Sequence, residues 1–170
     1  AYVVSEQANH ALVIIDLADL PGGYVSYTRN LGIGFSKGHT IYIDENGIGY
    51  IFGGNSATHG NASHFIDIAA NPTDPPYLGK YTTYIHDGFV RNDTLWACEI
   101  YAGKLRMLNV SNKTSAVSMG SKTTPNAFTH SAWPTTDGDY VYVTDEVNGA
   151  WVTAYNCSDA ADIKEVDRYK

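Results

Sequence analysis

The chain has 170 residues, 44% of them hydrophobic and 17% charged, and its formal net charge at pH 7 is −7. This composition is typical of one globular domain and excludes a disordered chain. The acidic balance argues against nucleic-acid and anionic-membrane partners, which need clustered Lys and Arg. No apolar run approaches the roughly 20 residues that span a bilayer. Because the sequence starts without Met or a signal peptide, we expect a processed or excised segment of a longer chain.

The predicted elements are short strands, since thirteen Tyr and sixteen Gly favour β structure. The first unit, residues 1–37, opens with AYVVSE, which aligns with the later stretches GYIFGG, LWACEI and YVYVTDE. Those stretches are second strands, so the first unit is expected to be partial. Complete units are expected at residues 38–84, 85–128 and 129–170.

Each complete unit opens on a histidine. His39, His86 and His130 stand 47 and 44 residues apart, in GHTIYIDENGIGYIFGGN, IHDGFVRNDTLWACEI and THSAWPTTDGDYVYVTDE. After each histidine come an apolar strand, a turn rich in Asp, Asn or Gly, and a second apolar strand. This is a hairpin signal that occurs three times.

A second landmark, an Asp or Asn after the third strand of each unit, recurs in step with the histidines. Its side chain can bond the backbone two residues on and turn the chain toward a fourth strand. The landmarks are Asp16, Asp67, Asn109 and Asn156. Four short strands in about 40–50 residues match a propeller blade. The sequence therefore predicts an all-β, β-propeller-like array of four-stranded antiparallel blades, about three complete and a partial first one. The final SDAADIKEVDRYK is expected to be a turn and a strand.

LVIID at Leu12–Asp16 resembles the motif of the LVIVD-repeat proteins, also called choice-of-anchor B proteins. The resemblance extends to the GHTIYIDENG, YIHDGF and THSAW blocks and so covers most of the chain. It implies an extracellular or surface-attached propeller whose biochemical role is largely undefined. Later units depart from the motif, with SHFID, LRMLN and VTAYN in its place, so the resemblance supports the fold more than a shared site.

The recurring histidines have two main interpretations. His39, His86 and His130 can be hydrogen-bonded packing residues, because each blade must solve the same packing problem. They can instead form a metal or polar-ligand site at the mouth of a central channel, with zinc or calcium as the ion and Asp87 as a ligand or orienting group. Catalysis by the His86–Asp87 pair is a third reading. The off-repeat histidines, His10, His59 and His64, are expected on loops or the surface.

Acids recur at the ends of the predicted second strands, at Glu6, Glu99 and Glu146, with Asp145 before the last. They can be charges that discourage strand association at sheet edges. They can also be carboxylates that join the histidines or hold Ca²⁺ through oxygen.

Nucleophile signatures are absent: the sequence has no G-x-S-x-G, no H-E-x-x-H and no phosphate loop of the usual spacing. The sequence therefore leans away from an enzyme. Cys98 and Cys157 can form one disulfide or remain as two buried thiols.

Five N-x-[ST] sequons exceed the roughly two that chance predicts from the Asn, Ser and Thr content. They begin at Asn61, Asn92, Asn109, Asn112 and Asn156. Asn61 and Asn92 lie in predicted turns and are the best acceptors, so in a eukaryotic source we expect N-linked glycan on at least one of them.

These observations favour an extracellular or cell-surface module with a structural or protein-interaction role. Its partners would be other protein chains or further copies of itself, held through open blade edges. The alternative is a metal-dependent enzyme or small-ligand-binding propeller with its site at the channel mouth.

Overall fold

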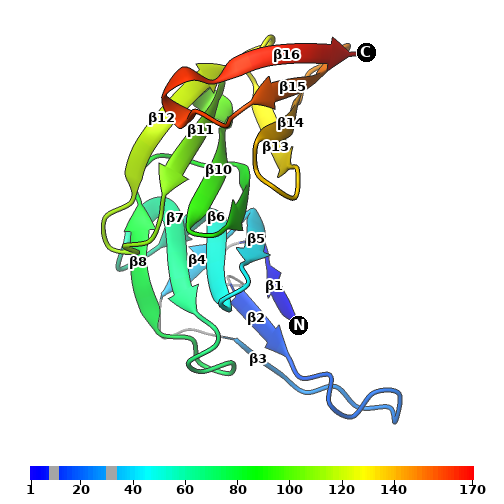
Figure 1. Ribbon diagram of the computed structural model, residues 1–170. Helices are drawn as coiled ribbons and strands as arrows, with labels where there is room; N and C mark the ends of the chain where they lie inside the picture. The colour runs from blue at the N-terminus through cyan, green and yellow to red at the C-terminus, as the bar shows by residue number, and fades with distance from the viewer. Residues whose placement is uncertain (8–11, 30–33) are drawn as a thin grey trace. The chain divides into compact units, whose positions relative to one another are not determined.

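The computed structural model describes residues 1–7, 12–29 and 34–170 (Figure 1). His10 lies outside these residues. The described chain is all-β, with sixteen strands, two short 3₁₀ helices and no α-helix, and its strands form four antiparallel sheets. None of its described helices is long or apolar enough to cross a membrane. The chain divides into two compact units, Ala1–Thr82 and Thr83–Lys170, which contain two sheets each.

The first sheet has three strands in the order β1 (Tyr2–Val4), β2 (Leu12–Ile15) and β3 (Tyr27–Arg29). Alternate residues of β2 are buried, as a half-covered strand requires. Leu12 and Ile14 enter a core cluster with the next sheet, whose further members are Phe35, Ile51, Ile66 and Ile68. The expectation of a partial first blade is confirmed.

The second sheet contains β5 (Thr40–Ile43), β6 (Ile48–Ser56), β7 (Gly60–Asp67) and β8 (Tyr77–Tyr81), with β4 (Phe35–Lys37) as a fifth strand. Both β4 and β5 pair with β6, which is nine residues long and has room for both. The innermost strand is thus one strand interrupted at Gly38–His39. Residues 35–37, which the sequence places in the first unit, pair in the second sheet.

The second compact unit contains two regular four-stranded meanders (Figure 1). One consists of β9 (Asp87–Arg91), β10 (Thr94–Glu99), β11 (Lys104–Asn109) and β12 (Val117–Thr123), with a 3₁₀ turn at Ile100–Ala102. The other consists of β13 (Thr129–Pro134), β14 (Tyr140–Asp145), β15 (Val152–Asn156) and β16 (Lys164–Tyr169), with a 3₁₀ turn at Ala160–Asp162. The prediction of a blade array is confirmed, as is the turn-plus-strand reading of the final segment.

The strand register places the three histidines at equivalent positions. The residue after each histidine pairs with the second strand, as Thr40↔Phe52, Asp87↔Cys98 and Ser131↔Thr144. The amides of His39 and His86 donate to the second-strand carbonyls of those partners, at 2.9 and 2.8 Å. At His130 the ladder shifts by one residue instead. Each histidine therefore stands within one residue of the point where β5, β9 or β13 begins.

The Asp and Asn landmarks have the predicted turn role. The Asp16 Oδ1 accepts from the Ala18 amide and the Asp67 Oδ1 from the Ala70 amide, both at 2.9 Å. In the second unit Asn109 and Asn156 each accept from the amide two residues on, at 3.0 Å. The repeat therefore depends on hydrogen bonds between these side chains and nearby backbone amides, as well as on the spacing of apolar residues.

Candidate functional site

Three candidate ligand side chains meet in the second compact unit: His86, His130 and Glu146. One nitrogen or carboxylate oxygen from each lies within 4.8 Å of the other two. The Glu146 Oε2 stands 4.0 Å from the His86 Nε2 and 3.8 Å from the His130 Nε2. The two imidazole rings lie 4.8 Å apart between centroids, tilted by 48°. The cluster therefore presents two imidazoles and one carboxylate toward a common point.

The backbone of this cluster is held by the two meanders. His86 precedes β9, where its amide is tied to Cys98, and Glu146 follows β14, where its amide donates to the Phe128 carbonyl at 3.0 Å. Exposure increases across the group, since the side chains of His86, His130 and Glu146 are 12%, 37% and 56% exposed. The site is anchored on one side and open to solvent on the other.

The surroundings of the cluster are acidic. Segments 84–90, 126–132 and 143–150, which contain the three residues, include Asp87, Asp145 and Glu146 but no Lys or Arg. Burial raises the pKa of the Cys98 thiol, and the negative charges of Asp87 and Asp145 raise it further. The buried Asp145 carboxylate accepts hydrogen bonds from the Thr124 hydroxyl and the Asn126 amide. This is an environment that favours a cation.

Two residues expected at the site are not among the three residues of this cluster. Asp87 starts β9 beside His86, and consecutive residues of a strand point to opposite sides, so its carboxylate is not part of the cluster. Glu146 supplies the carboxylate instead. His39 belongs to the first compact unit, where its Nδ1 lies 2.7 Å from the Glu6 Oε1. Of the four residues predicted to share a metal site, the cluster contains His86 and His130; a role for Asp87 and His39 at such a site stays a prediction.

The recurring glutamates occupy three different environments. Glu6 is exposed and contacts one histidine, and Glu146 contacts two. Glu99 is buried, and its carboxylate accepts from the Arg106 Nε at 2.7 Å. The interpretation of these acids as solvated edge charges does not fit Glu99. The reading in which carboxylates join the histidines agrees with Glu6 and Glu146.

His64, expected on the surface or in a loop, is fully buried in β7, so that expectation is wrong. Its ring packs edge-on against Phe35, with centroids 4.9 Å apart, and its Nδ1 lies 3.3 Å from the Tyr77 hydroxyl. Burial, with a smaller contribution from His59, lowers the pKa of His64 to about 4. His59 lies between β6 and β7, half-buried, and stacks on Tyr77. The run of apolar residues after His64 is the signal that could have identified the burial.

Both cysteines are free and buried, so the structure has no Cys98–Cys157 disulfide and agrees with the alternative of two buried thiols. Cys98 lies within β10 and Cys157 directly after β15, in different sheets. Burial raises the pKa of Cys157 to about 12. Neither thiol has the low pKa and exposure of a reactive cysteine.

The five sequon asparagines lie on turns or strand ends. Asn61, Asn92, Asn109 and Asn112 are exposed and Asn156 is half-buried. Asn92 and Asp93 both have positive φ in the tight β9–β10 hairpin turn. At Asn109, Asn112 and Asn156 the hydroxyl of the sequon Ser or Thr donates to the asparagine Oδ1. All but Asn156 thus present the asparagine to solvent.

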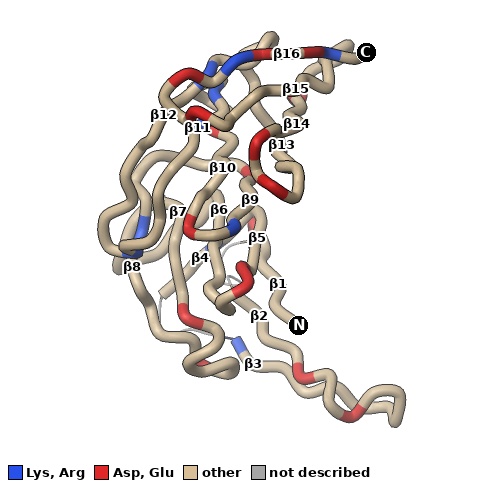
Figure 2. Tube along the Cα trace, in the orientation of Figure 1, with Lys and Arg blue, Asp and Glu red and all other residues tan. Residues whose placement is uncertain are grey.

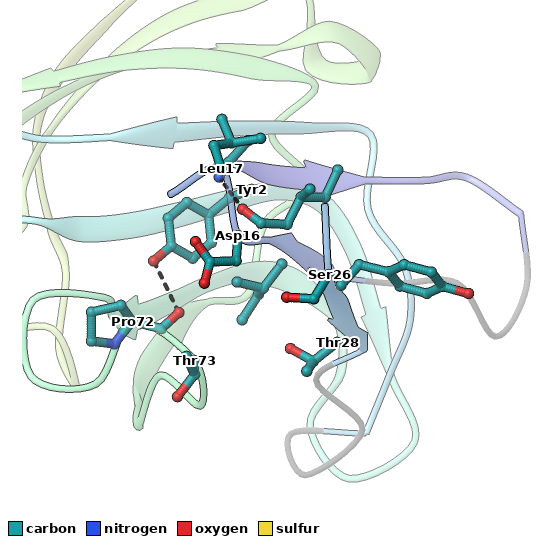
Figure 3. Close-up of a pocket in the computed structure, with 11 residues that line it drawn as sticks. Tyr2, Asp16, Leu17, Ser26, Thr28, Pro72 and Thr73 are labelled. Carbon is teal, nitrogen blue, oxygen red and sulfur yellow. Dashed lines mark hydrogen bonds between the residues drawn. The ribbon is translucent and has the colours of Figure 1, made fainter. Parts of the chain in front are cut away.

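The first compact unit contains a hollow of about 410 Å³ at the ends of β1, β2 and β3. Its polar groups include the Asp16 carboxylate and the hydroxyls of Ser26, Thr28 and Thr73 (Figure 3). The Tyr2 hydroxyl also lies at this hollow and donates to the Pro72 carbonyl at 2.9 Å (Figure 3). The lining of the hollow is partly polar and partly apolar, since it also includes Ile14, Ile15, Leu17 and Tyr27.

Next to this hollow, the connection between β2 and β3 exposes an apolar surface that the sequence patterns did not single out. Its five large apolar side chains, all at least 45% exposed, are Leu17, Leu20, Tyr24, Val25 and Tyr27. Figure 2 shows acidic positions along this connection, Asp16 and Asp19, and no basic one before Arg29. We call residues 16–28 the β2–β3 surface. Its signal in the sequence is the set of apolar residues placed around Pro21-Gly22-Gly23, where a turn is expected to be polar.

The sheet order and register define the class of protein, a β-propeller-like array of antiparallel blades. Two solved structures are similar to it, each with a TM-score of 0.59. One is a functionally unknown protein from Desulfotomaculum acetoxidans DSM 771, 12% identical, covering 99% of this chain and 66% of its own. The other is a "putative 6-phosphogluconolactonase" from Bacteroides uniformis ATCC 8492, 11% identical, covering 98% of this chain and 67% of its own. This chain thus spans about two thirds of the length of each.

No protein-family model matches the sequence, and no curated protein matches it. At 11–12% identity the two solved structures are similar in fold alone. Function must therefore be argued from the residues of this chain.

Proposed function

We propose that this chain is a β-propeller module that binds other protein chains at the cell surface or outside the cell, through its β2–β3 surface. The observation that carries the proposal is the set of five exposed apolar side chains within Leu17–Tyr27. Water-exposed Leu, Val and Tyr gathered in one short segment are unfavourable in an isolated domain, and such patches commonly mark protein contacts.

The geometry of this surface suits a protein partner. Tyr24 is 89% exposed, and its phenol supplies a large apolar area with a polar end, which is the kind of group that anchors interfaces. The adjacent hollow, lined by Leu17, Tyr27 and several hydroxyls, can accept one side chain of the partner. Because Asp16 and Asp19 flank the apolar groups, the partner would carry Lys or Arg at the rim of the contact.

Location outside the cell is part of the same proposal. It is supported by the exposed sequons at Asn61, Asn92, Asn109 and Asn112 and by the resemblance to LVIVD-repeat proteins. In native eukaryotic material, glycopeptide mass spectrometry should find glycan on Asn61 or Asn92. Bare asparagine at every sequon would contradict this part of the proposal.

Site-specific photo-crosslinking tests the interaction role. A photoreactive phenylalanine analogue in place of Tyr24 should give discrete protein adducts when the chain is exposed to its native surroundings. The matched control replaces Tyr169, a tyrosine on β16 in the other compact unit that is 79% exposed. Adducts that form at Tyr24, are absent at Tyr169 and disappear with Leu20→Ser support the proposal. Absence of any adduct at Tyr24, or equal adducts at both positions, contradicts it.

A second candidate is an enzyme that acts at the His86–His130–Glu146 cluster. The open imidazole of His130 beside Glu146 can serve as a general base toward water, and one structural neighbour bears a lactonase name. The segments that contain the cluster carry no Lys or Arg, so nothing in them matches a phosphate group. A neutral lactone or ester would therefore be the substrate. Hydrolysis of glucono-δ-lactone that is lost in His130→Asn would support this candidate, and a rate equal to buffer would exclude it for that lactone.

A further inference from the structure

We propose that His86, His130 and Glu146 form a binding site for a divalent transition-metal ion of the zinc type. The inference stands on the geometry of the cluster and is independent of the interaction role. It assigns the ligand set as two imidazole nitrogens and one carboxylate oxygen, with Glu146 in the place where the sequence suggested Asp87.

The chemistry of the donor set selects the class of ion. Two histidines with one carboxylate are ligands that Zn²⁺ and related first-row ions prefer, and three protein ligands are typical of a site with an open position. Ca²⁺ and Mg²⁺ bind through oxygen, and the cluster offers them only the Glu146 carboxylate. We therefore expect zinc-type ions to bind and Ca²⁺ and Mg²⁺ to bind weakly.

The distances require only a small adjustment. Tetrahedral zinc with bonds of about 2.0–2.1 Å places its ligand atoms about 3.3–3.4 Å apart. The Glu146 oxygen already lies 3.8 and 4.0 Å from the two imidazole nitrogens. Glu146 is the most exposed of the three side chains, so it has the freedom to shorten these two distances. The two imidazole nitrogens lie within 4.8 Å of each other, so the half-exposed His130 ring must also turn toward His86. The backbone at His86 and Glu146 is hydrogen-bonded and need not move.

The local charge favours a cation over an anion. Asp87 and Asp145 contribute negative potential at the nearby Cys98, and Glu146 adds a third carboxylate at the cluster itself. In the first compact unit the equivalent His39 has a carboxylate, that of Glu6, at hydrogen-bond distance. That pair is a natural control, because it consists of the same residue types at a repeat position and is not part of the three-residue cluster.

Bound metal would have a structural consequence. His86 precedes β9 of one meander, whereas His130 and Glu146 belong to the other, so an ion would join the two sheets of the second compact unit. Zinc should therefore raise the thermal stability of the wild-type chain and slow hydrogen exchange at the starts of β9 and β13.

Equilibrium dialysis of the full 170-residue chain against ZnCl₂, followed by elemental analysis, tests the proposal. We expect one saturable zinc per chain that 1 mM CaCl₂ or MgCl₂ does not displace. Glu146→Gln and His130→Asn, both at exposed side chains, should each weaken zinc binding at least tenfold, while Glu6→Gln and His39→Asn should leave it unchanged. Binding of Co²⁺ should give a visible absorption band that is lost with the same two variants.

Circular dichroism establishes that each variant is folded before its zinc binding is compared. Absence of saturable zinc binding by the wild-type chain would overturn the proposal. So would wild-type binding by folded Glu146→Gln and His130→Asn, or loss of the zinc in His39→Asn. Zinc that binds without raising the melting temperature would overturn the claim that it joins the two sheets.

Discussion

The two compact units use the same pair of residue types with different results. In the first unit the His39 Nδ1 lies 2.7 Å from the Glu6 Oε1, in a partly exposed contact. In the second, His86 and His130 lie beside each other and share the carboxylate of Glu146. The repeat assigns each histidine to the start of an innermost strand, and in the second unit the adjacent blade supplies the second imidazole and the carboxylate. Histidines at the same backbone position of the repeat therefore make different side-chain contacts.

Among the recurring glutamates, the largest expected effect on stability is at Glu99. Arg106→Met leaves the Glu99 carboxylate, which is 1% exposed, without the guanidinium now 2.7 Å away. Loss of one partner of a buried ion pair costs about 3–5 kcal/mol in the free energy of unfolding. Urea denaturation followed by tryptophan fluorescence would measure the loss.

The double variant Glu99→Met/Arg106→Met is the control for this prediction. Removing both charges should recover most of the stability, because no uncompensated buried charge remains. If Arg106→Met lowers the free energy of unfolding by less than about 1 kcal/mol, the ion pair of Glu99 contributes no more than an exposed ion pair does.

The next largest effect is a dependence of the free energy of unfolding on pH, which arises from His64 in the first unit. Its pKa is lowered from the ordinary 6.5 to about 4 in the folded chain, so the unfolded chain binds the proton more readily. Stability from the neutral ring is fully present above about pH 6.5 and is lost as the pH falls toward 4, by up to about 3 kcal/mol. Unfolding free energies of the wild type and His64→Phe, measured between pH 7 and pH 4, should converge or cross as the pH falls.

Phe35→Leu is the matched control, because it alters the same packing without removing a titrating group. It should keep the wild-type dependence on pH. A constant difference between the wild type and His64→Phe across this range would show that His64 titrates alike in the folded and unfolded chains.

The smallest effect is expected at the exposed pair of the first unit. Glu6→Gln removes the charge beside His39 where the Glu6 side chain is 69% exposed. Exposed pairs contribute about 0–1 kcal/mol, and the contribution falls with salt because the Debye length shrinks to about 3 Å at 1 M. Thermal unfolding in 50 mM and 1 M NaCl should detect at most a small difference at low salt. A loss above about 2 kcal/mol, unchanged by salt, would mean that Glu6 is structurally as important as Glu99.

Much of the fold could be predicted from the sequence because its determinants are local. Alternating apolar residues, Asx turns such as those at Asp16 and Asn109, and the 44- and 47-residue spacing of the histidines predict four-stranded units, since strand and turn formation depend on residues near in sequence. The same spacing placed His39, His86 and His130 at equivalent positions, and the register confirms it. Residues 35–37 were expected in the first unit, but they form β4 and pair with β6 in the second sheet. This pairing depends on the length of β6, which is nine residues and has room for both β4 and β5.

Which side chains meet depends on the packing of strands against one another. Glu146 rather than Asp87 joins the imidazoles, because adjacent strand residues point to opposite sides and because β13 and β14 bring residues 130 and 146 together. His64 is buried because β6 and β8 flank its strand and Phe35 of β4 packs against its ring. The apolar β2–β3 surface is exposed because no described segment packs over it within the first unit. Such contacts depend on packing between strands that are far apart along the chain, and spacing in one sequence does not specify them.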